Sequence, residues 1–223
     1  PKFISTLTNG SENINGQMQN KASKTQDMGE DKIVISLMDM GVQKQVKKNT
    51  EDQDRCNIYL NKKYPYSLNL NYAHGESYID LSELATKLIT INAGNAQVHV
   101  DYKKKNQIPM NLFSVKVGAG SVVINNMNLS RTNHFSADIV YGSLDLNFNE
   151  CGKINSKFQI KVGAGTLKVK IPKENTPVSI KMNISTFSTI KIPEGFTQQG
   201  EDTFVNETFR KGKHMQHLMN FTI

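Results

Sequence analysis

The chain has 223 residues, enough to bury one large hydrophobic core or two smaller ones. Its net charge of +7 comes from 24 lysines and three arginines against 20 acidic residues. So few arginines argue against a nucleic-acid partner, because arginine is the residue that contacts phosphate and guanine bidentately. No stretch of the sequence approaches the roughly 18 apolar residues of a membrane-spanning helix, so we expect no transmembrane segment in this chain.

The first part of the chain is polar. Residues 1–30 are rich in Asn, Gln, Ser, Thr and Lys, and such a segment buries too little apolar surface to offset the entropy lost on ordering. We therefore expect residues 1–30 to form an extended arm or tether. Apolar runs at 32–38 and 56–60 predict strands in an N-terminal β segment, residues 31–67, that packs on the rest of the protein.

From residue 68 onward the sequence repeats one pattern around glycines that are 19, 26, 22 and 23 residues apart. These glycines are Gly75, Gly94, Gly120, Gly142 and Gly165. Apolar side chains occur three, five and seven positions before each glycine, with Lys87 as the exception, and again two and four positions after it, more weakly after Gly75. Alternation with a period of two on both sides of a glycine predicts two half-buried strands joined by a bend.

Glycine suits such a bend because a Cβ would obstruct either the backbone conformation or the close approach of a neighbouring strand. A unit of this length cannot bury a core alone, so the units must stack. The predicted fold is all-β: short strands stacked into a single-stranded β-solenoid over residues 68–223, in about six units of which the last is incomplete. A β-sandwich of ordinary hairpins is the alternative.

Residues that could carry chemistry are scattered. The five histidines have no metal-ligand spacing, and Cys56 and Cys151 lie far apart without a CxxC pair. Two alternatives stay open for Cys56 and Cys151: a disulfide between them, or two free thiols. Asp138 and Asp145, on either side of Gly142, are the best acid pair for a polysaccharide-active enzyme, and Glu76 and Asp80 are a second, weaker pair. No clustered arginine or further carboxylate accompanies either pair. We expect no catalytic residue, no metal site and no cofactor.

Four lysines repeat in phase with the bends. Lys116 and Lys161 lie four positions before their glycines, and Lys168 and Lys170 alternate outward on the strand after Gly165. If stacking aligns them on one face, they form a stripe that suits a diffuse polyanion, such as an anionic envelope polymer. Solvated charges that keep an exposed sheet soluble are the other interpretation. The last predicted strand, 218–223, lacks a capping repeat, which predicts edge-to-edge self-association.

The two Val-Gly-Ala-Gly segments, residues 117–120 and 162–165, resemble the bacterial adhesin-like family of toast-rack domains. The strand segments at 167–172 and 188–193, each ending in proline, and the Phe204/Phe209 pair fit the same pattern. The resemblance covers residues 56–223. It implies a right-handed stack of short strands in an exported, envelope-associated protein, and it supplies no catalytic residues. Similar domains form the C-terminal parts of proteins that sense cell-wall stress.

These features predict a non-catalytic interaction or adhesin-like module that is secreted or lies in the bacterial cell envelope, periplasmic or surface-exposed. The alternatives are a structural or sensory domain of an envelope-stress protein and a polysaccharide-active β-helix enzyme. The sequence starts at Pro1 without an initiator Met or an export signal, so either a signal segment was removed or the sequence was cut from a longer one, and a lipid anchor in the precursor stays open. The expected partners are an anionic envelope polymer or another protein, and not nucleic acid.

Overall fold

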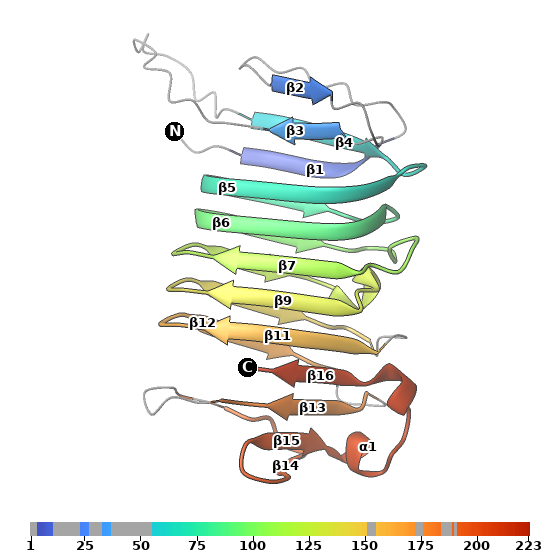
Figure 1. Cartoon of the computed structure of the whole chain (residues 1–223), viewed down its shortest axis with the longest axis vertical. Helices are drawn as coiled ribbons and strands as arrows, with labels where there is room; N and C mark the ends of the chain where they lie inside the picture. The colour runs from blue at the N-terminus through green and yellow to red at the C-terminus, as the bar shows by residue number, and fades with distance from the viewer. Residues whose placement is uncertain are drawn as a thin grey trace.

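The structure is a computed structural model in which short strands stack into a tall, all-β solenoid (Figure 1). It describes residues 4–10, 23–26, 33–36, 55–150, 155–172, 176–183, 189 and 191–223, with side chains from residue 58 onward. Each coil passes once along the front of the stack and once along the back, and a bend joins the two passes. The predicted fold class, stacked coils of a β-solenoid, is confirmed.

The first coils consist of long continuous strands, and the later coils of strand pairs. β5 (Pro65–Asp80) and β6 (Ala85–Asp101) pair in parallel along their whole length and each runs through the bend. In the next three coils the bend separates a front strand from a back strand. These pairs are β7 (Leu112–Val117) with β8 (Ser121–Ile124), β9 (His134–Ile139) with β10 (Ser143–Asn147), and β11 (Ser156–Val162) with β12 (Thr166–Lys170). A 3-10 helix, η1 (Met127–Ser130), lies between β8 and β9.

Strands from the first 61 residues extend the upper end of the stack. β1 (Ile4–Gly10) pairs in parallel with β4 (Arg55–Asn61) and with the second half of β5. β2 (Ser23–Gln26) and β3 (Ile33–Ser36) form a separate antiparallel pair. β1 therefore differs from the expected arm, because its Ile and Thr residues favour a strand once a parallel neighbour offers backbone hydrogen bonds. The division into arm, N-terminal segment and solenoid stays a prediction.

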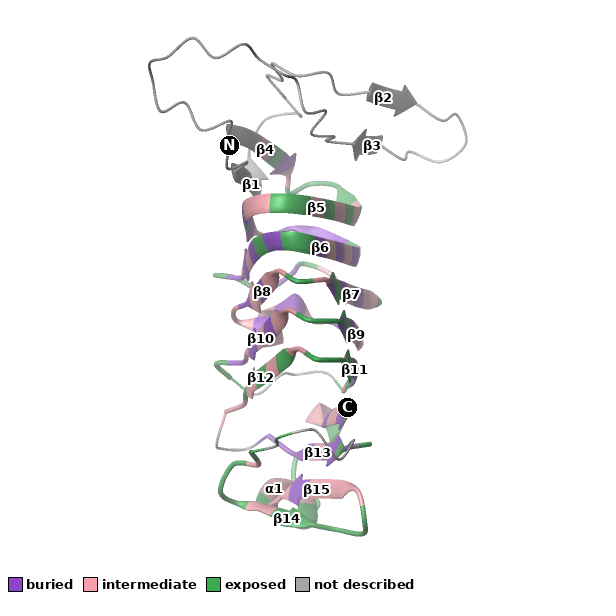
Figure 2. Cartoon of the chain, turned by 90° about the vertical axis from the view of Figure 1, so that its left-hand side faces the viewer, coloured by how far each residue is buried: buried purple, intermediate pink, exposed green. Residues whose placement is uncertain are grey.

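One continuous hydrophobic core lies between the front and back strands, and more buried residues alternate with less buried ones along strands such as β7, β9 and β10 (Figure 2). The front strands contribute a ladder of phenylalanines. The rings of Phe113 and Phe135 lie 5.6 Å apart and those of Phe135 and Phe158 lie 5.7 Å apart, measured between centroids. The back strands supply smaller aliphatic side chains such as Val122 and Leu144, both fully buried. The alternation leaves every second residue on an outer face.

The residues at the bends form a column that differs from the predicted one in a single coil. The column is Gly75, Ala96, Gly120, Gly142 and Gly165. Gly94 lies two positions before Ala96, so it is not the equivalent bend residue that the sequence pattern assigned. With Ala96 in the column, Ile89 replaces Lys87 at the seventh position before the bend, and the one exception in the apolar pattern disappears.

The later bends require glycine because neighbouring backbones approach closely, and not because of a left-handed φ. A Cβ on Gly165 would lie 2.5 Å from the carbonyl oxygen of Gly142, and Cβ atoms on Gly142 and Gly120 would lie closer still to the coil above. Hydrogen bonds hold the bends together: the N–H of Ser143 donates to the carbonyl of Gly120 at 3.0 Å. Gly75 is the member of this column with a positive φ, 99°.

The C-terminal strand is inserted into the sheet. β16 (Met219–Thr222) pairs in parallel with β11 on one side and with β13 (Val178–Lys181) on the other. The ring of Phe221 stacks 4.4 Å from that of Phe158 and extends the phenylalanine ladder. The prediction that the last strand is an uncovered edge is therefore wrong, because the chain folds back to fill a gap that sequence order does not reveal. Self-association stays a prediction, without this strand as its cause.

The lower end of the stack is an antiparallel extension. β15 (Thr203–Asn206) pairs with β13, and β14 (Phe196–Gln198) pairs with β15. The chain then passes through α1 (Glu207–Arg210) and η2 (Met215–His217) before it enters β16. Among the described residues, no helix is long and apolar enough to cross a membrane.

Alanine at Gly120 or Gly142 should destabilise the protein by about 1–3 kcal/mol, because the new Cβ forces the backbones of two coils apart. Ala119→Ser is a matched control, since Ala119 lies in the same bend with its side chain exposed; its effect should stay within about 0.5 kcal/mol. Urea denaturation measures both. Glycine variants with the wild-type midpoint would contradict the close packing of the bends.

Phe221→Ala should cost about 3–5 kcal/mol, because it removes a buried ring from the ladder. Thr222→Ala, the adjacent position with its side chain in solvent, should change the free energy of unfolding by no more than about 0.5 kcal/mol. Thermal denaturation followed by circular dichroism compares the two. Equal, small effects would mean that β16 does not occupy the gap between β11 and β13.

Candidate functional site

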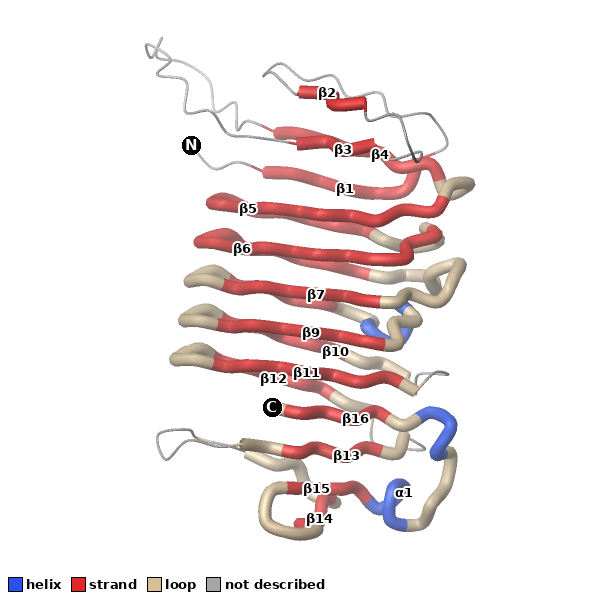
Figure 3. The backbone as a smooth tube through the Cα atoms, in the orientation of Figure 1, coloured by secondary structure: helices blue, strands red, loops and turns tan. Residues whose placement is uncertain are grey.

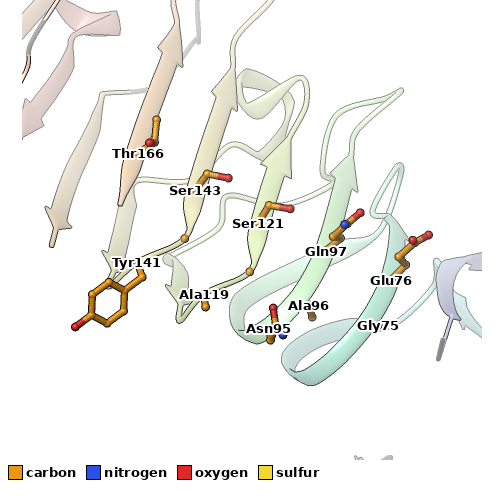
Figure 4. A pocket seen from close by; sticks show the side chains of 12 residues that line it. Gly75, Glu76, Asn95, Ala96, Gln97, Ala119, Ser121, Tyr141, Ser143 and Thr166 are labelled. Carbon is orange, nitrogen blue, oxygen red and sulfur yellow. The ribbon is translucent and has the colours of Figure 1, made fainter. Parts of the chain in front are cut away.

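A shallow groove of about 530 Å³ follows the bends along the stack (Figure 4). Polar side chains line it in one row, each from the start of a different back strand or back-strand segment. This row, the polar ladder, consists of Gln97, Ser121, Ser143 and Thr166, with Glu76 at its upper end. Because paired strands lie about 4.8 Å apart, the ladder repeats a hydroxyl or amide group at that interval along the stack.

Four small residues of the bend column also line the groove: Gly75, Ala96, Gly120 and Gly142. The bend amides there are already used between coils: the N–H of Ala119 donates to the carbonyl of Gly94 at 2.8 Å, and that of Thr166 donates to Gly142 at 2.9 Å. A ligand would therefore meet side-chain groups rather than free backbone donors. Beside the row, Tyr141 projects from its bend with 72% of its surface exposed. An exposed ring of this kind offers an apolar face next to polar groups.

The acids that the sequence singled out do not form a catalytic pair. Asp138 lies on the front strand β9 and Asp145 on the back strand β10, so they face opposite sides of the stack. Glu76 and Asp80 share one side of β5 but lie four residues apart, about 13 Å by the rise of a strand. The paired carboxyls of glycosidases lie about 5–9.5 Å apart. Neither predicted pair has this spacing.

The four predicted lysines lie on two faces. Lys116 on β7 and Lys161 on β11 face outward from the front, and Asp138 lies between them in the strand register. Lys168 and Lys170 are exposed on β12, a strand on the back of the stack (Figure 2). The single stripe of four lysines therefore does not form, because the bend after Val162 carries the chain to the other side of the stack. Anion binding by either pair stays a prediction.

Residues 5–125, more than half of the chain, match the family described as the N-terminal domain of toast_rack, DUF2154. The chain belongs to the toast-rack family. The matched range includes nearly all of β1 and most of the first 55 residues, which the resemblance seen in the sequence left out. No curated protein and no solved structure matches the chain. Membership in this family is consistent with an envelope-associated, non-enzymatic module.

Sequence reasoning missed a cluster of lysines in the loops at the end of the toast-rack coils opposite the bends (Figure 3). At its centre, Glu83 forms ion pairs with Lys104 and Lys62, each with a nitrogen–oxygen distance of 2.8 Å. The hydrogen bonds from Lys104 and Lys62 lower the pKa of Glu83 to about 2. The signal in the sequence was the pair of short lysine runs at 62–63 and 103–105, which are 41 positions apart and meet only once the loops are stacked.

No metal site is apparent in the part of the toast-rack chain that the structure describes. Those residues contain no group of three or more His, Cys, Asp or Glu side chains that could hold an ion. Cys56 lies on β4, but its side chain and the whole of Cys151 are outside the described residues, so the disulfide question stays as the sequence left it.

Glu83 should titrate with a midpoint about pH 2. Because its pKa is lower in the folded protein than its ordinary value of 4.5, the ion pairs stabilise the fold fully above that value and lose their effect as the pH falls toward 2. Lys62→Gln with Lys104→Gln should return the midpoint toward 4.5. NMR titration of the carboxyl carbon measures this. Lys63→Gln with Lys105→Gln, the same change in charge, should move it less; a wild-type midpoint near 4.5 would contradict the ion pairs.

Proposed function

We propose that this toast-rack chain is a non-catalytic, adhesin-like interaction module of the bacterial cell envelope, and that its bend groove holds an uncharged glycan chain. The polar ladder of Gln97, Ser121, Ser143 and Thr166 beside the exposed Tyr141 is the observation that carries the proposal. Family membership supports the envelope location and the absence of an enzymatic role.

The geometry of the groove favours an extended polymer over a compact ligand. Its polar groups come from successive coils and repeat along the stack, whereas a small-molecule site converges its polar groups on one enclosed point. A chain of sugar units laid along the stack would meet a hydroxyl or amide at each coil. Because the coils are fixed by core packing and backbone hydrogen bonds, the protein loses little conformational entropy on binding.

The chemistry of the lining favours a neutral sugar. Hydroxyl and amide groups donate and accept hydrogen bonds, as sugar hydroxyls do. Glu76 is the one carboxylate among the lining residues, and no lysine or arginine is present to neutralise a charged polymer. The face of Tyr141 can cover the apolar face of a sugar ring. The groove is thus complementary to a glycan without charge.

Binding of a soluble hexamer of β-1,4-linked N-acetylglucosamine, measured by isothermal titration calorimetry, tests the proposal. Replacing the three hydroxyls by Ser121→Ala, Ser143→Ala and Thr166→Val should weaken binding roughly tenfold or more, because several hydrogen bonds of about 0.5–1.5 kcal/mol each are lost. Tyr141→Ala should also weaken it. Both variants should keep the wild-type melting temperature, since these side chains lie outside the core.

The matched control is Ser114→Ala with Ser136→Ala. These serines also pair in register, but on the outer front face and away from the groove. This variant should bind as the wild type does. Absence of binding by the wild type, or the same loss in the front-face variant, would overturn the groove as the glycan site.

A further inference from the structure

We propose a second binding surface, at the opposite edge of the coils from the bend groove, that takes a linear polymer carrying repeated phosphate groups. This surface, the basic corner, is formed by three successive loops. Its residues are Lys62, Glu83, Lys103, Lys104, Lys105 and Gln107, with Leu129 of η1 beside them. A groove of about 510 Å³ lies among them. Figure 3 shows the loops that carry them at the edge of the coils opposite the bends.

The basic corner concentrates positive charge that the sequence spreads over three loops. Lys62 precedes β5, Glu83 lies between β5 and β6, and Lys104 follows β6. Together with Asp80, which pairs with Lys103 at 3.4 Å, the corner has four lysines against two carboxylates, a net charge of +2. The side chains of Lys103 and Lys104 are 72% and 67% exposed, so their charges face solvent. Among the described residues, Lys105 makes no ion pair.

Glu83 fixes the positions of two of these cations. Its two carboxylate oxygens each bind one ammonium group, from Lys62 and Lys104, so that two like charges are held side by side. Its backbone has a left-handed φ of 59°, which is costly for a residue other than glycine, and the side chain of Gln107 donates to its carbonyl at 2.6 Å. Strained residues held by their neighbours are common at functional sites.

The loop that carries Lys103, Lys104 and Lys105 is anchored in the core. The fully buried side chain of Asn106 accepts hydrogen bonds from the amide and hydroxyl of Thr86, at 2.9 and 2.8 Å. It also donates to the carbonyls of Thr86 and Ile108, both at 2.8 Å. An anchored loop presents its lysines without a large ordering cost on binding.

The residue types favour phosphate spread along a polymer. Lysine is a compact point charge that binds phosphate without fixed bidentate geometry. The arginine next to the corner, Arg131, instead donates to the carbonyls of Asn106 and Gln107 and so holds the loop. The charges come from successive loops and follow the stack, which matches a linear polyanion. Leu129 is the one apolar residue of the lining, so the corner has no cluster of large apolar side chains that could insert into a membrane.

The test compares two triple variants with the same change in charge. The corner variant carries Lys62→Gln, Lys103→Gln and Lys105→Gln, and the distal variant carries Lys157→Gln, Lys191→Gln and Lys213→Gln, three exposed lysines outside the corner. Binding to linear polyphosphate is measured by calorimetry at low and at physiological salt. The corner variant should bind roughly tenfold more weakly and with a shallower salt dependence, because fewer counterions are released. The distal variant should bind within about twofold of the wild type.

Three outcomes would overturn the proposal. Equal losses in the two variants would mean that net charge alone attracts the polymer, and no binding by the wild type would exclude a phosphate polymer. Binding to vesicles rich in phosphatidylglycerol without binding to polyphosphate would assign the corner to a membrane surface. If the corner variant melts early, Lys103→Gln with Lys105→Gln leaves both ion pairs of Glu83 intact and should still weaken binding. The groove variants should bind polyphosphate normally, so failure of the glycan site leaves this test unaffected.

Discussion

The close approach of backbones at the bends is the constraint on which the rest of the structure depends. Where a carbonyl of one coil lies within contact distance of the α-carbon of the next, a side chain has no room, and Gly120, Gly142 and Gly165 are required for steric reasons. The same approach lets each bend donate hydrogen bonds to the coil above. The bends therefore fix the register of the coils, and that register lines up the phenylalanine rings inside and the polar side chains outside.

Register also explains why both candidate surfaces lie at the edges of the stack. On the flat outer faces, residues of neighbouring strands that pair in register carry charges of both signs. Asp138, for example, lies between Lys116 and Lys161. At the bends, small residues and the polar ladder together line a groove. At the opposite edge, loops free of the strand pattern bring Lys62, Glu83 and Lys104 together. The paired strands thus set a constant distance between successive bends at one edge of the stack and between successive loops at the other.

Much of the fold could be predicted from the sequence, because alternation around a glycine is a local signal. The one exception to this alternation, Lys87, belongs to the unit in which the sequence pattern placed the bend residue two positions too early, at Gly94. Placing Ala96 in the bend column required the strand pairing, which cannot be read from the sequence. The insertion of β16 between β11 and β13 could not be predicted, since it joins strands far apart in the chain. The bend groove and the basic corner were missed for the same reason: each gathers residues about 21 to 24 positions apart, and only stacking brings them together.

Native-state hydrogen exchange of the bend amides tests the central claim, that the bends are packed parts of the stack and set its register, most directly. Solvent-exposed loops normally exchange at low opening free energies, far below that of global unfolding. If the bends are packed as described, the amides of Gly120, Tyr141, Ser143 and Thr166 should exchange as slowly as those of the core strands β7 and β9. Exchange at the rate of an exposed loop, such as that around Gly200, would show that the bends do not set the register.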